Sequence, residues 1–188
     1  MNSLLKEIRS CRACESFLPC GPRPIVQAHT AAQLLIVGQA PGLAVHQTGI
    51  PWNDPSGERL RDWIGLSKNT FYNPEKVAIA PIGFCYPGRA KSGDASPRPE
   101  CYPLWHSRLR SELPNVRLTL LIGRHAQARY LNPKLNMSST VRSWQQYLPG
   151  FLPMPHPSPR NNIWLRKNPW FEEEALSQIR ALVASAIV

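Results

Sequence analysis

Four cysteines have a spacing that suits metal binding. Cys11 and Cys14 form a Cys-x-x-Cys pair, and Cys85 and Cys101 follow much later in the chain. Thiolates from two distant segments can converge on a tetrahedral zinc ion or on a [4Fe–4S] cluster, and the spacing does not separate the two. Disulfides are disfavoured in the cytosol, and the charged surroundings of the first pair argue against simple burial. We expect a metal centre at these four residues, with Cys20 left over as a structural residue.

Two loops rich in glycine and proline carry the other chemically interesting residues. The first is Gly38–Gly42 (GQAPG) and the second is His156–Asn161 (HPSPRN). Each loop follows a short apolar run typical of a strand that ends in a turn. In a parallel sheet the ligand site lies at the carboxyl ends of the strands. We therefore expect the two loops to lie at that edge of the sheet.

Apolar runs and helix signals alternate along the chain. Asp54 suits a helix N-cap and Pro55 the first helical position, and Gly65 suits the end of that helix. We read the proline-rich stretch Tyr86–Pro103 as a long ordered loop. Strands are expected at Gln33–Val37, Val77–Ile82, Leu118–Ile122 and Phe151–Pro155, and helices at Met1–Ser10, Pro55–Ile64, Arg98–Leu113, Arg124–Leu131 and Phe171–Val188.

This alternation predicts an α/β fold of three layers, α/β/α, with a central, mainly parallel four-stranded sheet. The length of 188 residues suits one compact domain, and no internal repeat is visible. We expect a single domain over residues 1–188, on which a cysteine-bearing N-terminal segment, residues 1–32, packs.

The charge favours a polyanionic partner. Lys and Arg number 22 against 12 Asp and Glu, which gives a formal net charge of +10. Lysine and arginine displace the counterions that condense on nucleic-acid phosphates. No apolar run is long enough to cross a membrane, and Met1–Ser10 reads as an amphipathic helix and not as a signal peptide. We expect a cytoplasmic protein that binds DNA, with no membrane and no obligate protein partner, most simply a monomer.

Taken together, the two loops resemble the two motifs of uracil-DNA glycosylases. Between them, Thr48–Trp52 (TGIPW) resembles the threonine–glycine–X–proline–aromatic segment of that superfamily. The resemblance runs from about Cys11 to Val183. It is closest to the iron–sulfur class, whose cluster cysteines fall at the equivalents of Cys11, Cys14, Cys85 and Cys101, so the resemblance implies a [4Fe–4S] cluster, with zinc as the lesser possibility. The second motif also resembles that of the single-strand-selective class.

The resemblance implies cleavage of the N-glycosidic bond of a base that is flipped out of DNA. His156 would donate a hydrogen bond to the pyrimidine O2 and stabilise the departing base. Trp52 would stack on the base, unless it is simply a core aromatic residue. Backbone amides of Gln39 and Ala40 would contact the base or hold the attacking water, and Asp54 would orient that water or cap its helix.

The remaining implied contacts are to the DNA backbone and the gap left by the flipped base. Ser158, with the adjoining loop amides, would clamp a phosphate. The side chains placed to enter the gap are Arg160, Asn161 and Asn162.

Four residues depart from the patterns of the superfamily and leave the preferred base open. Gln39 replaces a glutamate, and Ala40 stands where many relatives carry an Asp or Asn that activates water. Pro81 stands where an asparagine reads the uracil edge, and Gly42 replaces a tyrosine that excludes 5-substituted pyrimidines.

Several functions fit this sequence. The first is a glycosylase, most simply monofunctional, for uracil or a related damaged base. The second is a glycosylase for a 5-substituted uracil such as 5-hydroxymethyluracil, or for a deaminated purine. The third is a DNA-binding protein of the same fold that has lost catalysis. A zinc-ribbon-like module is disfavoured, because Cys85 and Cys101 lie deep within the α/β pattern.

Overall fold

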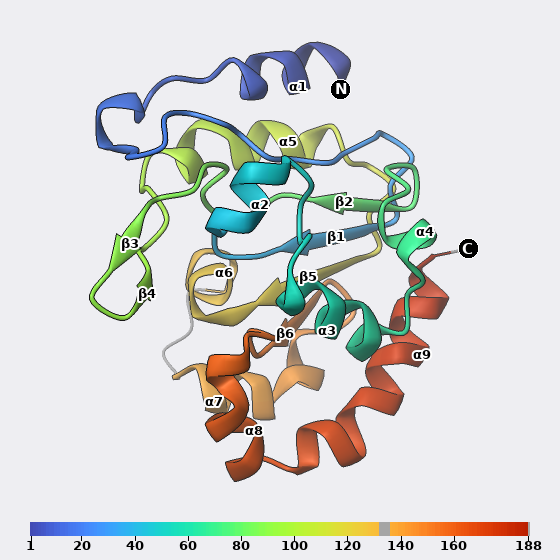
Figure 1. Ribbon diagram of the computed structural model, residues 1–188. Helices are drawn as coiled ribbons and strands as arrows, with labels where there is room; N and C mark the ends of the chain where they lie inside the picture. Colours follow the sequence, from blue (N-terminus) through green and yellow to red (C-terminus); the bar gives the residue numbers. More distant parts are fainter. Residues whose placement is uncertain (132–135, 188) are drawn as a thin grey trace.

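The computed structural model describes residues 1–131 and 136–187. At its centre lies a sheet of four parallel strands in the order β2-β1-β5-β6 (Figure 1). These are β1 (Leu34–Val37), β2 (Val77–Ile79), β5 (Leu118–Ile122) and β6 (Phe151–Met154). Leu34 of β1 pairs with both Val77 and Leu118, so β1 lies between β2 and β5. The predicted parallel sheet is confirmed.

A second, smaller sheet and the helices make up the rest of the described structure. A separate two-stranded hairpin consists of β3 (Arg89–Ala90) and β4 (Gly93–Asp94). The helices are α1 (Asn2–Arg9), α2 (Leu43–Thr48), α3 (Pro55–Ile64), α4 (Lys68–Phe71), α5 (Ser107–Ser111), α6 (Gly123–Tyr130), α7 (Met137–Arg142), α8 (Asn162–Lys167) and α9 (Leu176–Ala186). Shorter helical segments are η1 (Glu15–Phe17), η2 (Tyr102–His106), η3 (Trp144–Tyr147), η4 (Pro159–Asn161) and η5 (Phe171–Ala175).

Alternation along the strands divides the core into two layers. Successive side chains of a strand point to opposite faces. Leu34 and Ile36 of β1 therefore join one buried cluster, with residues of α3, α7, α8 and α9. Leu35 and Val37 join the other, with residues of α1, α5 and α6. The result is the expected three-layer α/β/α arrangement, with the apolar side of α1 packed on the second cluster.

The structure corrects several element boundaries. Strand β2 ends at Ile79 and not at Ile82, although the Ala80 and Ile82 N–H groups still donate to the Ile36 and Gly38 carbonyls. The helix expected from Arg98 begins only at Tyr102, after Pro97 and Pro99. The stretch Tyr86–Pro103 contains the β3–β4 hairpin and is not a plain loop. The last helix ends at Ala186, and Val188 lies outside the described residues.

Four short helices, α2, α4, α7 and α8, were not expected from the sequence. Each has six residues or fewer, which is too short to display helical periodicity. No helix within residues 1–131 and 136–187 has the length and apolar character needed to span a membrane.

Candidate active site

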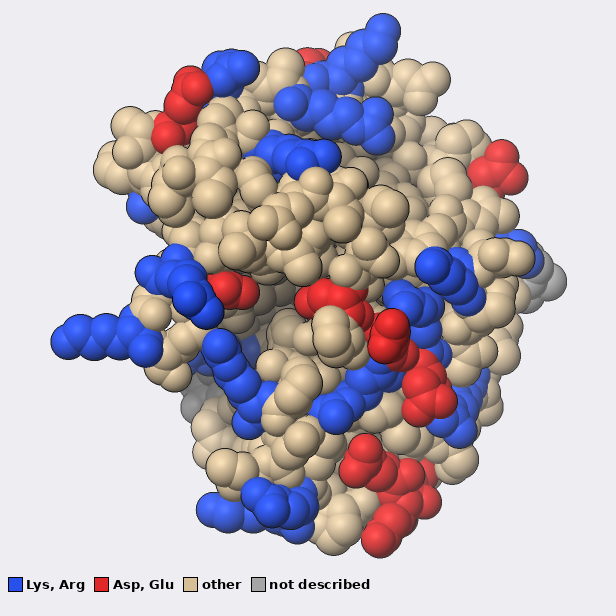
Figure 2. Space-filling view, in the orientation of Figure 1, with Lys and Arg blue, Asp and Glu red and all other residues tan. Residues whose placement is uncertain are grey.

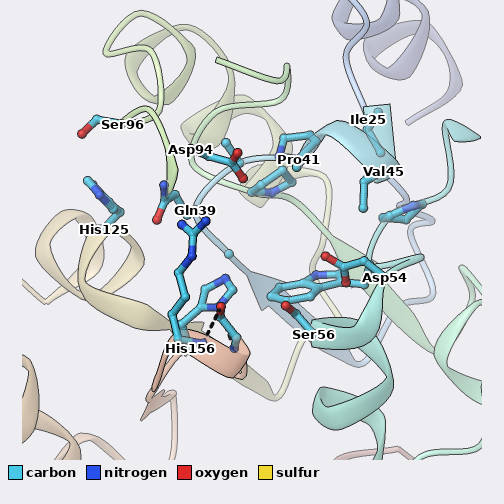
Figure 3. A pocket seen from close by; sticks show the side chains of 18 of the residues that line it. Ile25, Gln39, Pro41, Val45, Asp54, Ser56, Asp94, Ser96, His125 and His156 are labelled. Carbon is cyan, nitrogen blue, oxygen red and sulfur yellow. Dashed lines mark hydrogen bonds between the residues drawn. The ribbon is translucent and has the colours of Figure 1, made fainter. Parts of the chain in front are cut away.

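The carboxyl ends of the four parallel strands open into one cavity of about 440 Å³ (Figure 3). Gly38–Gly42 enters it after β1, and Pro81 after β2. Arg124 and His125 follow β5, and the second motif follows β6. The two motif loops thus lie together at the carboxyl edge of the sheet, as expected. From these loops and their neighbours come the polar lining residues Gln39, Asp54, Ser56, Ser92, Asp94, Ser96, Arg124, His125, His156, Ser158, Arg160 and Asn161.

His156 lies in this cavity as a neutral hydrogen-bond donor. Its Nδ1 accepts a hydrogen bond from the backbone N–H of Ser158 at 3.2 Å, so the proton of the neutral ring is on Nε2. Burial, with a smaller contribution from the charge of His125, lowers the pKa of His156 to about 4. Gly123, directly after β5, leaves space for this histidine. Its φ is +80°, and a Cβ there would lie 3.3 Å from the His156 Cβ. The ring therefore keeps its Nε2–H available near neutral pH.

Trp52 provides an aromatic surface beside that histidine. The two ring centroids are 5.6 Å apart and the ring planes are inclined by 34°. The Trp52 backbone has a φ of +55°, in the left-handed region that non-glycine residues rarely adopt. Gly38 and Gly57 make room for it, because a Cβ at Gly38 would lie 2.8 Å from the Trp52 ring. Trp52 both lines the cavity and packs against the core. Its position therefore suits stacking on a base as well as a place among the core aromatic residues.

Asp54 likewise has two roles in the structure. Its Oδ1 accepts a hydrogen bond from the Gly57 N–H at 2.8 Å, which makes it the N-cap of α3 as expected. Asp54 also lines the cavity (Figure 3). Burial is the main reason that the pKa of Asp54 is raised. A partly buried carboxylate is thus available to a molecule in the cavity.

The first motif forms the wall between β1 and the hairpin. The Gln39 side chain donates to the Ala95 carbonyl at 3.3 Å, and the Gln39 carbonyl accepts from the Gly83 N–H at 3.0 Å. Ala40 lines the cavity through its small side chain and backbone. Gly42 is the N-cap residue of α2 and contributes no side chain.

Pro81 lines the cavity and its carbonyl is already engaged. His106, which is buried, approaches the Pro81 oxygen with Nε2 at 3.0 Å and the Tyr130 hydroxyl with Nδ1 at 2.9 Å. The imidazole also stacks on Phe84 at 5.5 Å between centroids. Burial lowers the pKa of His106 to about 4. This support for the Pro81 loop was not predicted, because no motif marks His106.

The second motif is held together by its own hydrogen bonds. The Ser158 Oγ accepts from the Arg160 N–H at 3.3 Å, and the Asn161 amide donates to the His156 carbonyl at 2.7 Å. Ser158, Arg160 and Asn161 all line the cavity. Asn162 does not: its side chain accepts from Arg59 at 2.8 Å in a separate groove. The structure thus brings three of the four predicted DNA-contacting residues to the site.

The β3–β4 hairpin adds residues that the sequence did not reveal. Asp94, with Ser92 and Ser96 beside it, lines the cavity. Arg160 of the second motif lies directly against Gly93, which has a φ of +93° and no side chain to obstruct the contact. Arg89 and Lys91 of the same hairpin are exposed. Figure 2 shows Lys and Arg side chains around the hollowed face of the molecule, with a few acidic side chains inside its edge.

The four expected metal ligands line a second, much smaller pocket. Cys11, Cys14, Cys85 and Cys101 surround it together with apolar side chains, while Cys20 is exposed elsewhere. Burial raises the pKa of Cys85 to about 11 and that of Cys101 to about 12. In the described part of the chain, no group of three His, Cys, Asp or Glu side chains is arranged to hold one metal ion. The thiols converge without forming a compact single-ion site.

A polar cavity at the carboxyl edge of a parallel sheet, surrounded by cations, is the arrangement expected of an enzyme that acts on a nucleic acid. Sequence comparison makes the class specific. The uracil DNA glycosylase superfamily matches residues 26–180, and the chain belongs to this superfamily. The fold is therefore that of a DNA glycosylase, a hydrolase whose substrate is DNA. The match begins after Cys14, so it does not distinguish the iron–sulfur class within the superfamily.

Proposed function

We propose that this chain hydrolyses the N-glycosidic bond of uracil or a related modified base in DNA. The observation that supports this most directly is the neutral His156, which offers an N–H to the cavity beside the ring of Trp52. A flipped base stacks on an aromatic face and is held at its edge by hydrogen bonds. Trp52 supplies the aromatic face, and His156 supplies a hydrogen-bond donor.

His156 acts in this proposal by stabilising the departing base. Its Nε2–H donates to the pyrimidine O2 while the bond from C1′ to the base nitrogen breaks and its electron pair passes to the base. A water oxygen adds to C1′ and gives up a proton, and the base is released after protonation. A preorganised donor of this kind typically contributes about 10²–10³ in rate.

Asp54 is the group that we propose orients the attacking water. The first motif has no carboxylate, since it carries Gln39 and Ala40. Asp54 lines the same cavity, and burial raises its pKa, which makes its carboxylate a better proton acceptor. Backbone amides of the first motif hold the base or the water beside it.

We further propose that the enzyme is monofunctional and holds DNA through the second motif. No lysine is among the described residues that line the cavity, so no amine there could form a Schiff base with the sugar. Ser158 and the neighbouring amides contact a phosphate. Arg160, which lies against Gly93 of the hairpin, fills the gap left by the base in this proposal, whereas the Asn161 side chain fixes the loop.

We propose that Cys11, Cys14, Cys85 and Cys101, which line one small apolar pocket, hold the [4Fe–4S] cluster that the resemblance implies. All four sulfurs face one apolar pocket, and the Arg23 and Phe84 backbone N–H groups donate to the sulfurs of Cys85 and Cys101. Zinc at the same four cysteines is the lesser alternative. Iron and acid-labile sulfide at about four each per chain would support the cluster. Colourless protein with stoichiometric zinc would overturn it.

An excision assay tests the proposed activity. Matched single- and double-stranded oligonucleotides would each carry one uracil, 5-hydroxymethyluracil or hypoxanthine, and alkaline cleavage at the abasic site would report base loss. We expect the wild-type protein to release at least one of these bases. If it releases none and still binds DNA, a non-catalytic DNA-binding protein becomes the better description. Gln39, Ala40 and Pro81 are the departures that would then explain the loss.

A further inference from the structure

Asp94 brings a carboxylate to the cavity from an element that neither motif contains. It is the last residue of β4, in the hairpin that follows β2. Gln39 anchors the hairpin through the Ala95 carbonyl, and Arg160 packs on Gly93. Both motif loops therefore fix the position of Asp94. Figure 3 shows Asp94 at the upper side of the cavity and His156 at the lower side.

Gly42 leaves this carboxylate open to the cavity. A Cβ built at Gly42 would lie 3.4 Å from the Asp94 Oδ2, so any larger side chain there would compete with the carboxylate for space. The Gly42 φ is −78°, a value that any residue adopts, so the backbone itself does not require glycine. The space beside Gly42 is thus bordered by the Asp94 carboxylate and is not purely apolar.

Phosphate binding does not account for an acidic residue at this place. The same hairpin carries the exposed cations Arg89 and Lys91, and a carboxylate beside DNA phosphates opposes them. Asp54 and Asp94 both line this cavity, and the charge of Asp94 adds to burial in raising the pKa of Asp54. Asp94 is exposed and lines the cavity that a flipped base would enter.

The two sides of the cavity have opposite hydrogen-bonding character. His156 offers a donor, whereas the carboxylate oxygens of Asp94 offer acceptors. A base held between them must present an acceptor toward His156 and a donor toward Asp94. In a pyrimidine the ring atom opposite C2, which bears O2, is C5. Uracil has only a C–H there, whereas a 5-hydroxymethyl group has an O–H.

We propose that Asp94 is a specificity-determining residue that accepts a hydrogen bond from a donor-bearing substituent at C5. The inference rests on the proposed glycosylase function and extends it to a substrate class. It favours 5-hydroxymethyluracil over uracil. It also disfavours 5-formyluracil, whose substituent is of similar size but offers only an acceptor.

Single-turnover excision by wild type and variants tests the assignment. Identical duplexes would carry uracil, 5-hydroxymethyluracil or 5-formyluracil, and each variant is compared with wild type on each base, so that differences in intrinsic reactivity cancel. Asp94→Ala should lower the 5-hydroxymethyluracil rate roughly tenfold, the loss expected for one hydrogen bond to a charged group. The uracil rate should stay within about twofold. Asp94→Asn should raise the relative rate on 5-formyluracil, because its amide can donate to the formyl oxygen.

Glu58→Gln is the matched control, since it removes an exposed carboxylate near Asp54 but outside the cavity. It should leave the ratios between bases unchanged. Equal losses on all three bases with Asp94→Ala and Asp94→Asn would overturn the specificity role, and so would unchanged ratios. A wild-type protein that releases no base contradicts the proposed function itself. Melting temperatures of all variants establish that they are folded.

Discussion

The proton on His156 is placed by a single main-chain hydrogen bond. Because Nδ1 accepts from the Ser158 N–H, the ring keeps its other nitrogen protonated and turned to the cavity. The Asn161 amide holds the carbonyl of the same histidine. The short second motif thus fixes both the tautomer and the position of the group that we expect to act on the base.

Replacement of His156 by alanine should separate catalysis from binding. We expect His156→Ala to lower single-turnover excision by about 10²–10³, because the developing negative charge on the base loses its donor. Affinity for lesion-containing DNA should change little. Trp52→Ala is the contrasting variant: loss of stacking should weaken both rate and lesion affinity, by about 1–3 kcal/mol. Similar effects of the two variants on binding would contradict these separate roles.

The pKa of His156 predicts a pH dependence of stability. The value is about 4 in the folded chain, below the ordinary value of 6.5, mainly because the ring is buried and to a smaller extent because of the charge of His125. Between these values the unfolded chain binds a proton that the folded chain does not, so stability present above pH 6.5 is lost as the pH falls toward 4. From pH 7 to pH 5 this histidine should contribute up to about 2 kcal/mol of loss. Urea unfolding of wild type and His156→Gln measures it.

The His156→Gln protein should lose less stability over the same pH range. His106, which also has a pKa of about 4, is present in both proteins and cancels in the comparison. An equal loss in the two proteins would show that His156 is not held neutral by burial.

At the level of elements, helix α3 allows the two roles of Asp54 to be separated. Asparagine caps helices about as well as aspartate, while alanine costs about 1 kcal/mol. Asp54→Ala should therefore lower the free energy of unfolding by that amount and Asp54→Asn should scarcely change it. Both should slow excision if the carboxylate orients water. Full activity of Asp54→Asn would restrict the residue to its capping role.

The β3–β4 hairpin should contribute to the salt dependence of DNA binding. Arg89→Ala with Lys91→Ala should weaken binding and flatten the slope of log K against log salt, by about 0.9 for each DNA phosphate that these cations neutralise in the wild-type protein. Lys6→Ala with Arg9→Ala removes the same charge from α1, which does not line the cavity. That control pair should leave the slope nearly unchanged. Equal changes would indicate a diffuse basic surface.

Elements with strong local signals were predictable, and those positioned by distant contacts were not. Strand β5 is a buried run of apolar residues interrupted only by Thr119, and α3 carries its own start and stop in Asp54 and Gly65. The hairpin has no apolar alternation, and it is held by contacts with Gln39 and Arg160. Among site residues, the motif histidine was identifiable from its loop, whereas Asp94 lies in a stretch with no recognisable pattern.

Two other positions show the same limit of local reasoning. His106 is buried because Tyr130 and the Pro81 carbonyl satisfy its nitrogens, and both partners are far away in sequence. Asn162 adjoins the second motif, yet the start of α8 turns it toward Arg59. The neighbouring sequence predicted neither the burial of His106 nor the direction of the Asn162 side chain.

For the whole molecule, the cysteine pocket fastens the N-terminal segment to the sheet domain. Cys11 and Cys14 belong to that segment, Cys85 follows β2 and Cys101 precedes η2. If the pocket holds the proposed cluster, removal of its iron by a chelator should expose residues near Cys11 to proteases, while the central sheet stays protected. Limited proteolysis with identification of the cut sites would show this. Cuts spread equally over the sheet, or no new cuts, would contradict a fastening role.

The position of β1 in the sheet has a consequence for synthesis on the ribosome. All four of its side chains are buried, and its two neighbours are made later: Val77 pairs with it first, and Leu118 only after much more of the chain has emerged. Until then one edge of an apolar strand stays open, and such edges pair readily with other chains. The nascent polypeptide thus keeps an open apolar strand edge even after β2 has emerged, and chaperone binding would protect it until β5 is made.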